Sequence, residues 1–110
     1  MAYDEELADR LRTALEGQDG VVEKKMFGGL AFLVGGHMAV AASGPGGLMV
    51  RCEPDRTDEL LAEPGATPFE MRGGGMKGWL RVETEAVADD AALGRWIDVG
   101  VGYVETLPPK

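Results

Sequence analysis

The feature that most limits the fold is a stretch of 25 residues, Met26 to Val50, without a single Asp, Glu, Lys or Arg. An uncharged stretch of this length is long enough to cross a bilayer. Glycines divide it at 28–29, at 35–36 and in the segment 44–47. The remaining pieces, about five to seven residues each, have the length of buried strands and not of a membrane helix. We therefore predict a series of short strands and no membrane span.

The predicted strands follow one another with very short connections. They cover residues 21–27, 30–34, 37–43 and 48–52. Gly35 and Gly36 can both adopt positive φ, which is typical of a two-residue hairpin loop. Connections this short join neighbouring strands in antiparallel order, so we predict a β-meander.

Three helices are predicted around this meander. The first covers residues 4–16, with apolar side chains at helical spacing on one face: Leu7, Ala8, Leu11, Ala14 and Leu15. A short second helix begins at Pro54 and ends before Pro64-Gly65. The third is capped by Asp89 and Asp90 and carries its apolar residues on one face, at Leu93, Trp96, Ile97, Val101, Val104 and Leu107.

A last pair of strands, 67–71 and 78–84, is predicted on either side of the segment 72–75. The element order is then α-β(4)-α-β(2)-α. Three helices and one antiparallel sheet indicate an α+β fold, a two-layer sandwich. A chain of 110 residues has the size of one domain, so we expect residues 1–110 to form a single domain.

The charges are distributed unevenly between predicted helices and strands. The formal net charge is −8, which excludes binding to nucleic acid or anionic membranes through bulk attraction. The helical segments 1–19, 53–63 and 83–110 hold 17 acidic and five basic residues, whereas the strand segments 20–52 and 64–82 hold two acidic and six basic residues. If all helices cover one face of the sheet, its other face is weakly basic.

Catalytic and metal-binding patterns are weak throughout the chain. Cys52 is the only cysteine and His37 the only histidine, so neither a disulfide within the chain nor a zinc site of four Cys and His ligands can form. Both residues fall in predicted strands, where a Cys is usually buried filler. The segment 73–78 has glycines and a lysine but lacks the Gly-Lys-Ser/Thr ending of a phosphate-binding loop. We therefore expect no enzyme activity, no metal and no cofactor.

The N-terminal residues, Met1 to Glu6, are acidic where an export signal would be basic and then apolar. Together with the single cysteine, this favours a cytoplasmic protein.

Basic and aromatic residues gather on two of the predicted strands. This candidate interaction patch consists of Lys24, Lys25, Phe27, Gly28, Gly29, Lys77 and Trp79. One interpretation is a surface that faces an anion or a partner protein. The other is that Phe27 and Trp79 pack in the core, while the lysines occupy ordinary solvent-facing positions of an amphipathic sheet. The pattern alone leaves both interpretations open.

The same motifs resemble the N-terminal domain of the TfoX/Sxy family over almost the whole chain. The resemblance rests on the Met-Phe-Gly-Gly motif within residues 22–29, on 30–34 and 48–51, and on Pro68-Phe69 and Gly78-Trp79. It implies a secretion-chaperone-like sandwich in a stand-alone, single-domain member. It also implies kinship with bacterial regulators of natural competence, which act as coactivators for a cyclic-AMP-receptor-type transcription factor. The family supplies no catalytic residues to carry over.

The function expected from these observations is a non-enzymatic regulatory module that binds a protein partner, such as part of the transcription machinery. Direct binding to nucleic acid is not expected. A homodimer through the sheet or the last helix is a further hypothesis. The alternative is a small-ligand-binding or enzymatic domain that uses a cleft beside the glycine-rich hairpins, near Lys25 and Lys77.

Overall fold

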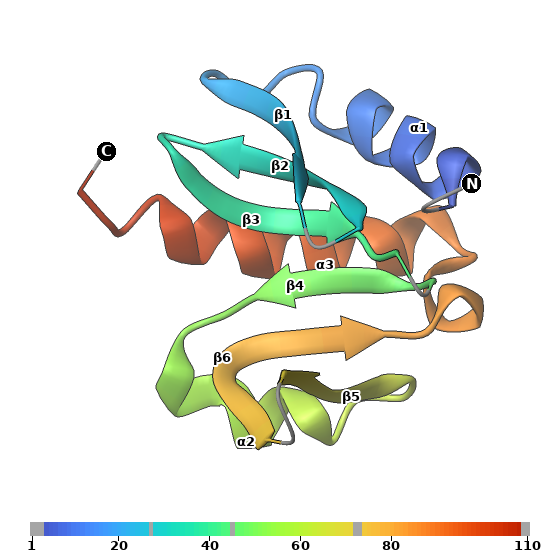
Figure 1. The fold of residues 1–110 in the computed structure, drawn as a ribbon, viewed down its shortest axis with the longest axis vertical. Coiled ribbons are helices and arrows are strands. Elements are labelled where there is room, and N and C mark those ends of the chain that lie inside the picture. Colours follow the sequence, from blue (N-terminus) through green and yellow to red (C-terminus); the bar gives the residue numbers. More distant parts are fainter. Residues whose placement is uncertain (1–3, 27, 45, 72–73, 109–110) are drawn as a thin grey trace.

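The computed structural model describes residues 4–26, 28–44, 46–71 and 74–108, with the backbone alone for Met26, 70–71 and 74–77. It is an open six-stranded antiparallel sheet with three helices packed against it (Figure 1). Its elements are α1 (Glu5–Ala14), β1 (Val21–Met26), β2 (Gly29–Val34), β3 (His37–Ala42), β4 (Leu48–Arg51), η1 (Pro54–Arg56), α2 (Thr57–Leu61), β5 (Ala66–Met71), β6 (Gly74–Val82), η2 (Thr84–Val87) and α3 (Asp90–Val104). The predicted element order and the α+β sandwich are confirmed.

The uncharged stretch forms short strands divided at its glycines, as predicted, and these strands lie next to one another in the sheet. Its strands β2, β3 and β4 pair in sequence, and Gly35 and Gly36 close the first hairpin with φ of 62° and 86°. The full strand order is β1-β2-β3-β4-β6-β5, so β6 pairs with β4 and leaves β5 at the second edge. None of the helices in the described part of the chain has the length and apolar character needed to cross a membrane.

Several details differ from the sequence prediction; most element ends shift by one or two residues, and the helix predicted to begin at Pro54 begins at Thr57, after the 3-10 turn η1. Strand β6 begins at Gly74 and ends at Val82, because the backbone stays in the ladder through glycines that were predicted to form a loop. Helix α3 ends at Val104, and Leu107 packs against the core from beyond the helix. Ala14 is exposed, because a cleft between α1 and α3 leaves that position of α1 uncovered.

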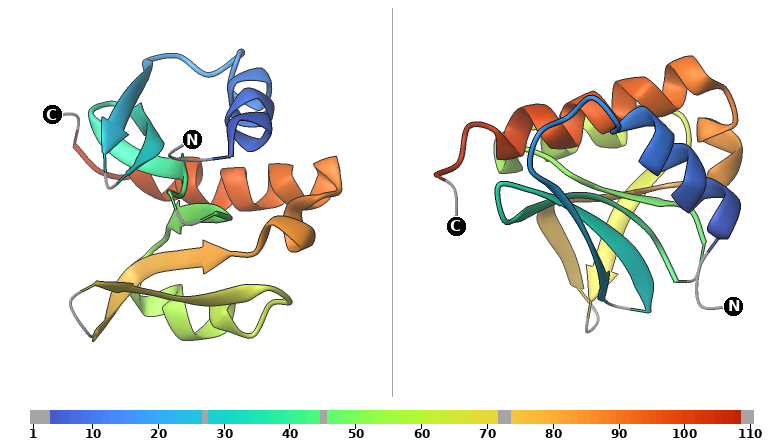
Figure 2. Two further views of the ribbon diagram at one scale, coloured as in Figure 1. Left: turned by 45° about the vertical axis from the view of Figure 1, so that its right-hand side comes forward. Right: turned by 90° about the horizontal axis from the view of Figure 1, so that it is seen from above.

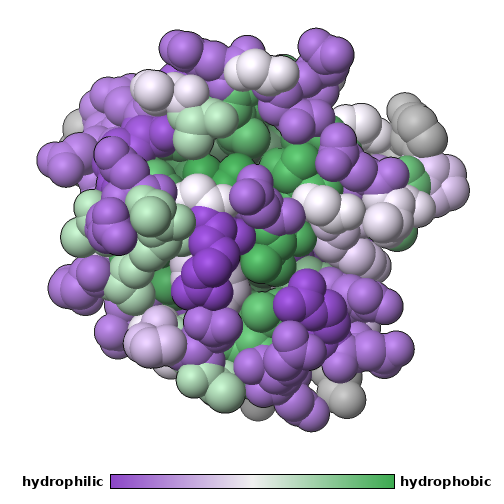
Figure 3. Space-filling view, turned by 180° about the vertical axis from the view of Figure 1, so that it is seen from behind, coloured by the Kyte–Doolittle hydropathy of each residue, from purple (hydrophilic) through white to green (hydrophobic). Residues whose placement is uncertain are grey.

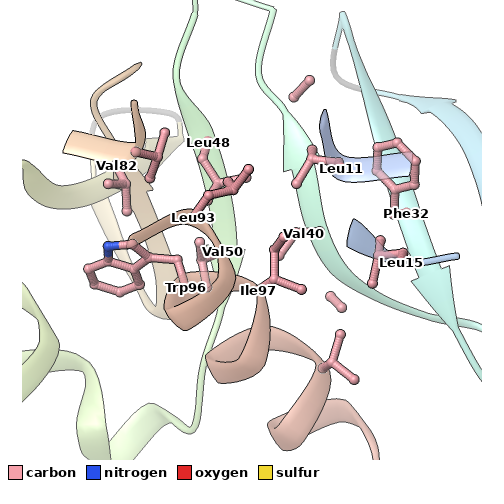
Figure 4. Packing of buried hydrophobic residues seen from close by; sticks show 14 of the residues in the cluster. Leu11, Leu15, Phe32, Val40, Leu48, Val50, Val82, Leu93, Trp96 and Ile97 are labelled. Atoms are coloured by element: carbon pink, nitrogen blue, oxygen red, sulfur yellow. The ribbon is translucent and has the colours of Figure 1, made fainter. Parts of the chain in front are cut away.

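All three helices lie on the same face of the sheet. Leu11 of α1, Leu60 of α2 and Trp96 of α3 belong to one buried cluster, together with strand residues such as Phe32 and Val50 (Figure 4). In the view from above, α1 and α3 run along one side of the strands (Figure 2, right). Seen from behind, hydrophilic side chains cover this layer, with hydrophobic ones visible between them (Figure 3). We refer to this side of the sheet as the covered face.

Helix α3 lies close against the backbone of β3 at Gly100. A Cβ atom there would overlap the backbone carbonyl oxygen of Ala39, so no larger residue fits without a shift of the helix. A Cβ atom at Gly94 or Gly102 would meet no atom within 4 Å. Of these three glycines of α3, therefore, only Gly100 is required by packing.

Candidate functional site

The second face of the sheet carries its own small apolar cluster. Ala31, Met38, Ala41 and Met49 are buried there, and the half-buried side chains of Leu33, Phe69 and Trp79 pack around them. Residues paired across an antiparallel ladder lie on the same face. The register therefore adds Val22, Lys24, Arg51, Thr67 and Arg81 to this side. We call these twelve residues the open face.

No helix in the described part of the chain lies over the open face, which Figure 1 shows from the front and Figure 2 from the side. Its charged residues with described side chains are Lys24, Arg51 and Arg81, all basic. The helical segments on the opposite side hold most of the acidic residues of the chain. The condition for a weakly basic open side, that all three helices share one face, is thus met.

The two lysines of the predicted patch are separated by the pleat of β1. Lys24 pairs with Ala31 and lies on the open face, whereas Lys25 pairs with Leu30 and lies on the covered side. Both are exposed. Glu23 confirms this orientation, because it forms a bidentate ion pair with Arg12 of α1 at 2.8 and 3.0 Å. The structure therefore does not bring Lys24 and Lys25 together in one patch.

The remaining patch residues divide into structural and surface positions. Gly28 is an exposed turn residue with φ of 73°, and Gly29 is buried where a Cβ atom would overlap the Ala42 carbonyl oxygen. Both glycines are thus required by the backbone. Trp79 is half-buried on the open face. Phe27 and the side chain of Lys77 lie outside the described residues.

Two arginines of the open face were missed by the sequence analysis. Arg51 ends β4, with its guanidinium carbon 5.2 Å from the ring centroid of Trp79 and 5.5 Å from that of Tyr103. The Nε and Nη2 groups of Arg81 donate hydrogen bonds to the Gly46 carbonyl oxygen at 3.0 and 2.8 Å. The available signal for Arg51 was the alternating direction of side chains along a strand, which places Met49 and Arg51 on the same side.

Cys52 and His37 are each engaged in structural contacts. Cys52 is only 1% exposed, its Sγ lies 3.9 Å from Oγ1 of Thr57, and burial raises the pKa of its thiol. Nε2 of His37 lies 2.7 Å from the Pro108 carbonyl oxygen, which can only accept, so this nitrogen is assigned as the protonated one. A neutral, buried thiol is a poor nucleophile. Among the described residues, no three His, Cys, Asp or Glu side chains converge as metal ligands would.

Two of the clefts in the described part of the chain, one between α1 and α3 and one beside a glycine-rich turn, bear on a small-ligand function. The cleft between α1 and α3 measures about 710 Å³, but its Arg10 is already held by Asp90 at 2.9 Å and by the Ala88 carbonyl oxygen. A second cleft of about 280 Å³ lies beside the glycine-rich turn, against Gly46, Gly47 and Arg81. It falls below the usual size of ligand pockets, and Arg81 is tied to the turn itself.

The comparison with protein families agrees with this architecture. The family model described as the TfoX N-terminal domain matches residues 13–102, from the end of α1 to the last turn of α3. No curated protein and no solved structure is significantly similar to the chain. The match includes every strand of the sheet and therefore both of its faces. The chain belongs to the TfoX N-terminal domain family.

Proposed function

We propose that the chain is a non-enzymatic regulatory module that binds an acidic surface of a partner protein through the open face. The observation that carries this proposal is the combination of apolar and basic side chains on the face that no described helix covers. The acidic residues of the helices lie on the other side. A partner that approaches the open face is thus attracted locally by Lys24, Arg51 and Arg81.

The apolar part of the open face suits a protein contact. Val22, on the edge strand β1, is 59% exposed, and Leu33, Phe69 and Trp79 keep part of their surface accessible. Aromatic residues and arginines contribute most of the binding energy in typical protein interfaces, especially beside apolar groups that exclude water. The open face offers both kinds of residue within one surface.

The charge distribution favours protein over nucleic acid as the partner. Duplex DNA attracts proteins through many lysines and arginines, and a net charge of −8 opposes its approach at long range. The three described basic side chains within this apolar surface match a small acidic area better than a continuous phosphate backbone. The kinship with TfoX-type regulators supports a regulatory role, with the transcription machinery as the source of the partner.

The two lysines of β1 provide a matched test. Lys24→Glu reverses a charge on the open face, and Lys25→Glu makes the same change one residue later on the opposite side. We expect a set of host proteins to co-purify with the tagged wild-type chain and with Lys25→Glu, and to be lost with Lys24→Glu. Equal loss or equal retention in both variants would reject the open face as the binding surface.

Sedimentation of the same three proteins tests whether the partner is a second copy. A wild-type dimer that Lys24→Glu alone converts to a monomer would place the acidic partner surface on the chain itself. If the wild type and both variants are monomers, the acidic partner surface belongs to another protein.

A further inference from the structure

Arg51 is distinct among the arginines that the structure describes, a set that leaves out Arg72. Arg10, Arg12, Arg56 and Arg95 each pair with a carboxylate, and Arg81 donates to the Gly46 carbonyl oxygen. Arg51 has neither an ion pair nor a side-chain hydrogen bond with any described residue. The residue as a whole is nevertheless half-buried, and no described group accepts a hydrogen bond from its guanidinium.

Two aromatic rings from different layers of the fold hold the Arg51 guanidinium. Trp79 reaches it from β6 on the open face, and Tyr103 reaches it from α3 on the covered side, with centroid distances of 5.2 and 5.5 Å. Rings stack on the flat faces of a guanidinium, whereas its N–H groups point outward in its plane. The contacts with Trp79 and Tyr103 therefore restrain the guanidinium of Arg51 without using its N–H groups as donors to a described acceptor.

We propose that Arg51 is the anchor of the open face and binds a carboxylate of the partner through two parallel N–H···O hydrogen bonds. This inference rests on the proposed function and names the group that is recognised: the Asp or Glu side chain of an acidic protein segment. A guanidinium matches a planar carboxylate in bidentate geometry, and partial burial strengthens the pair. Met49 and Trp79 beside Arg51 favour a carboxylate that is flanked by apolar residues.

Arg81 provides the internal control for this assignment. It lies on the same face, pairs across the ladder with Met49, and carries the same charge as Arg51. Two of its nitrogens already donate to Gly46. A general attraction to positive charge would involve both arginines, whereas bidentate recognition requires Arg51.

The first experiment follows the Nε–Hε resonances of the uniformly ¹⁵N-labelled full chain by NMR. The probe is a soluble peptide of Glu and Leu residues, and the control is its Gln-for-Glu counterpart. We expect a saturable shift of the Arg51 resonance with the Glu peptide, none with the Gln peptide, and little movement of Arg81. No binding of the Glu peptide, or binding that leaves Arg51 unmoved, would overturn the proposal. A preference for inorganic phosphate over the Glu peptide would overturn the choice of a carboxylate.

The second experiment compares Arg51→Lys with Arg81→Lys, which both preserve the charge. A lysine cannot form the bidentate pair. We expect Arg51→Lys to weaken binding of the Glu peptide about tenfold and Arg81→Lys less than threefold. Equal effects would refute an anchor at Arg51. Host partners that are lost with Lys24→Glu yet retained by Arg51→Lys would refute the anchor while leaving the proposed function intact.

Discussion

The two faces of the sheet divide stability and recognition between them. On the covered face, 22 buried residues from strands and helices form one continuous cluster, whereas only four described residues are buried in the cluster of the open face. Apolar burial is the main source of folding free energy. Substitutions on the covered face should therefore change stability, and those on the open face should mainly change binding.

The division begins at the level of a single strand. In β4, Leu48 and Val50 point into the covered cluster, while Met49 and Arg51 lie on the open side. An antiparallel sheet can leave one face without a second layer, because the alternation of side chains directs successive residues of a strand to opposite faces. The arginine at the end of this strand can thus be substituted without removing a side chain from the main core.

The largest contrast is expected between the two tryptophans. Trp96 is 1% exposed within the covered cluster, so Trp96→Ala should lower the free energy of unfolding by about 3–5 kcal/mol. Trp79 is half-buried on the open face, and Trp79→Ala should cost about 1 kcal/mol. Urea unfolding of both variants measures the difference, with similar m-values as the control for an unchanged unfolding transition. Equal losses would contradict the division between the two faces.

An intermediate contrast is expected within helix α3. Gly100→Ala places a methyl group against the Ala39 carbonyl oxygen and should destabilise the fold by about 1–3 kcal/mol, despite the better helix propensity of Ala. Gly94→Ala meets open space and should stabilise it by about 0.5–1 kcal/mol. Thermal unfolding measures both shifts, and Gly102→Ala serves as a second open position. If Gly100→Ala also stabilised the protein, that result would contradict the close contact between Gly100 of α3 and Ala39 of β3.

Local patterns in the sequence were sufficient to predict most of the fold. The glycine pairs marked the hairpins, Asp89 capped the last helix through Ala91, and the apolar spacing identified nearly all buried residues of α1 and α3. The predicted start of β6, at Gly78, was wrong. Gly74 and Gly75 pair with β5, but two adjacent glycines are typical of a turn and do not indicate strand pairing. Ala14 was also placed in the core, although nothing in one helix shows where a neighbouring helix leaves a cleft.

The candidate site was predicted less completely than the fold. Its residues come from different segments of the chain, and strand pairing decides which of them share a face of the sheet. Neighbouring residues of a strand point to opposite sides, so the adjacent Lys24 and Lys25 could not form one patch once β1 had paired. The cluster around Arg51 joins β4, β6 and α3, and its ring from α3 is separated from Arg51 by more than 50 positions. No local periodicity encodes such a contact.

The smallest expected effect is a change in the pH dependence of stability caused by Cys52, which belongs to the covered cluster. Burial raises the pKa of its thiol above the ordinary value of 9.0 that applies to the unfolded chain. Between these two pKa values the folded protein keeps a proton that the unfolded chain has lost, so the unfolding free energy falls as the pH rises above about 9. The contribution is complete below that pH and is lost as the pH approaches the folded value.

Cys52→Ala isolates this effect from other groups that titrate in the same range. We expect the unfolding free energy of the wild type to fall more steeply between neutral pH and about pH 10 than that of Cys52→Ala, measured in urea. Val22→Cys in the Cys52→Ala background moves the only thiol to the exposed edge of the open face. That thiol should react quickly with a disulfide reagent and add no such pH dependence, because exposure leaves its charged form solvated. If the unfolding free energy of this variant also fell steeply with pH, burial of the thiol on the covered face would not be the cause of the pH dependence.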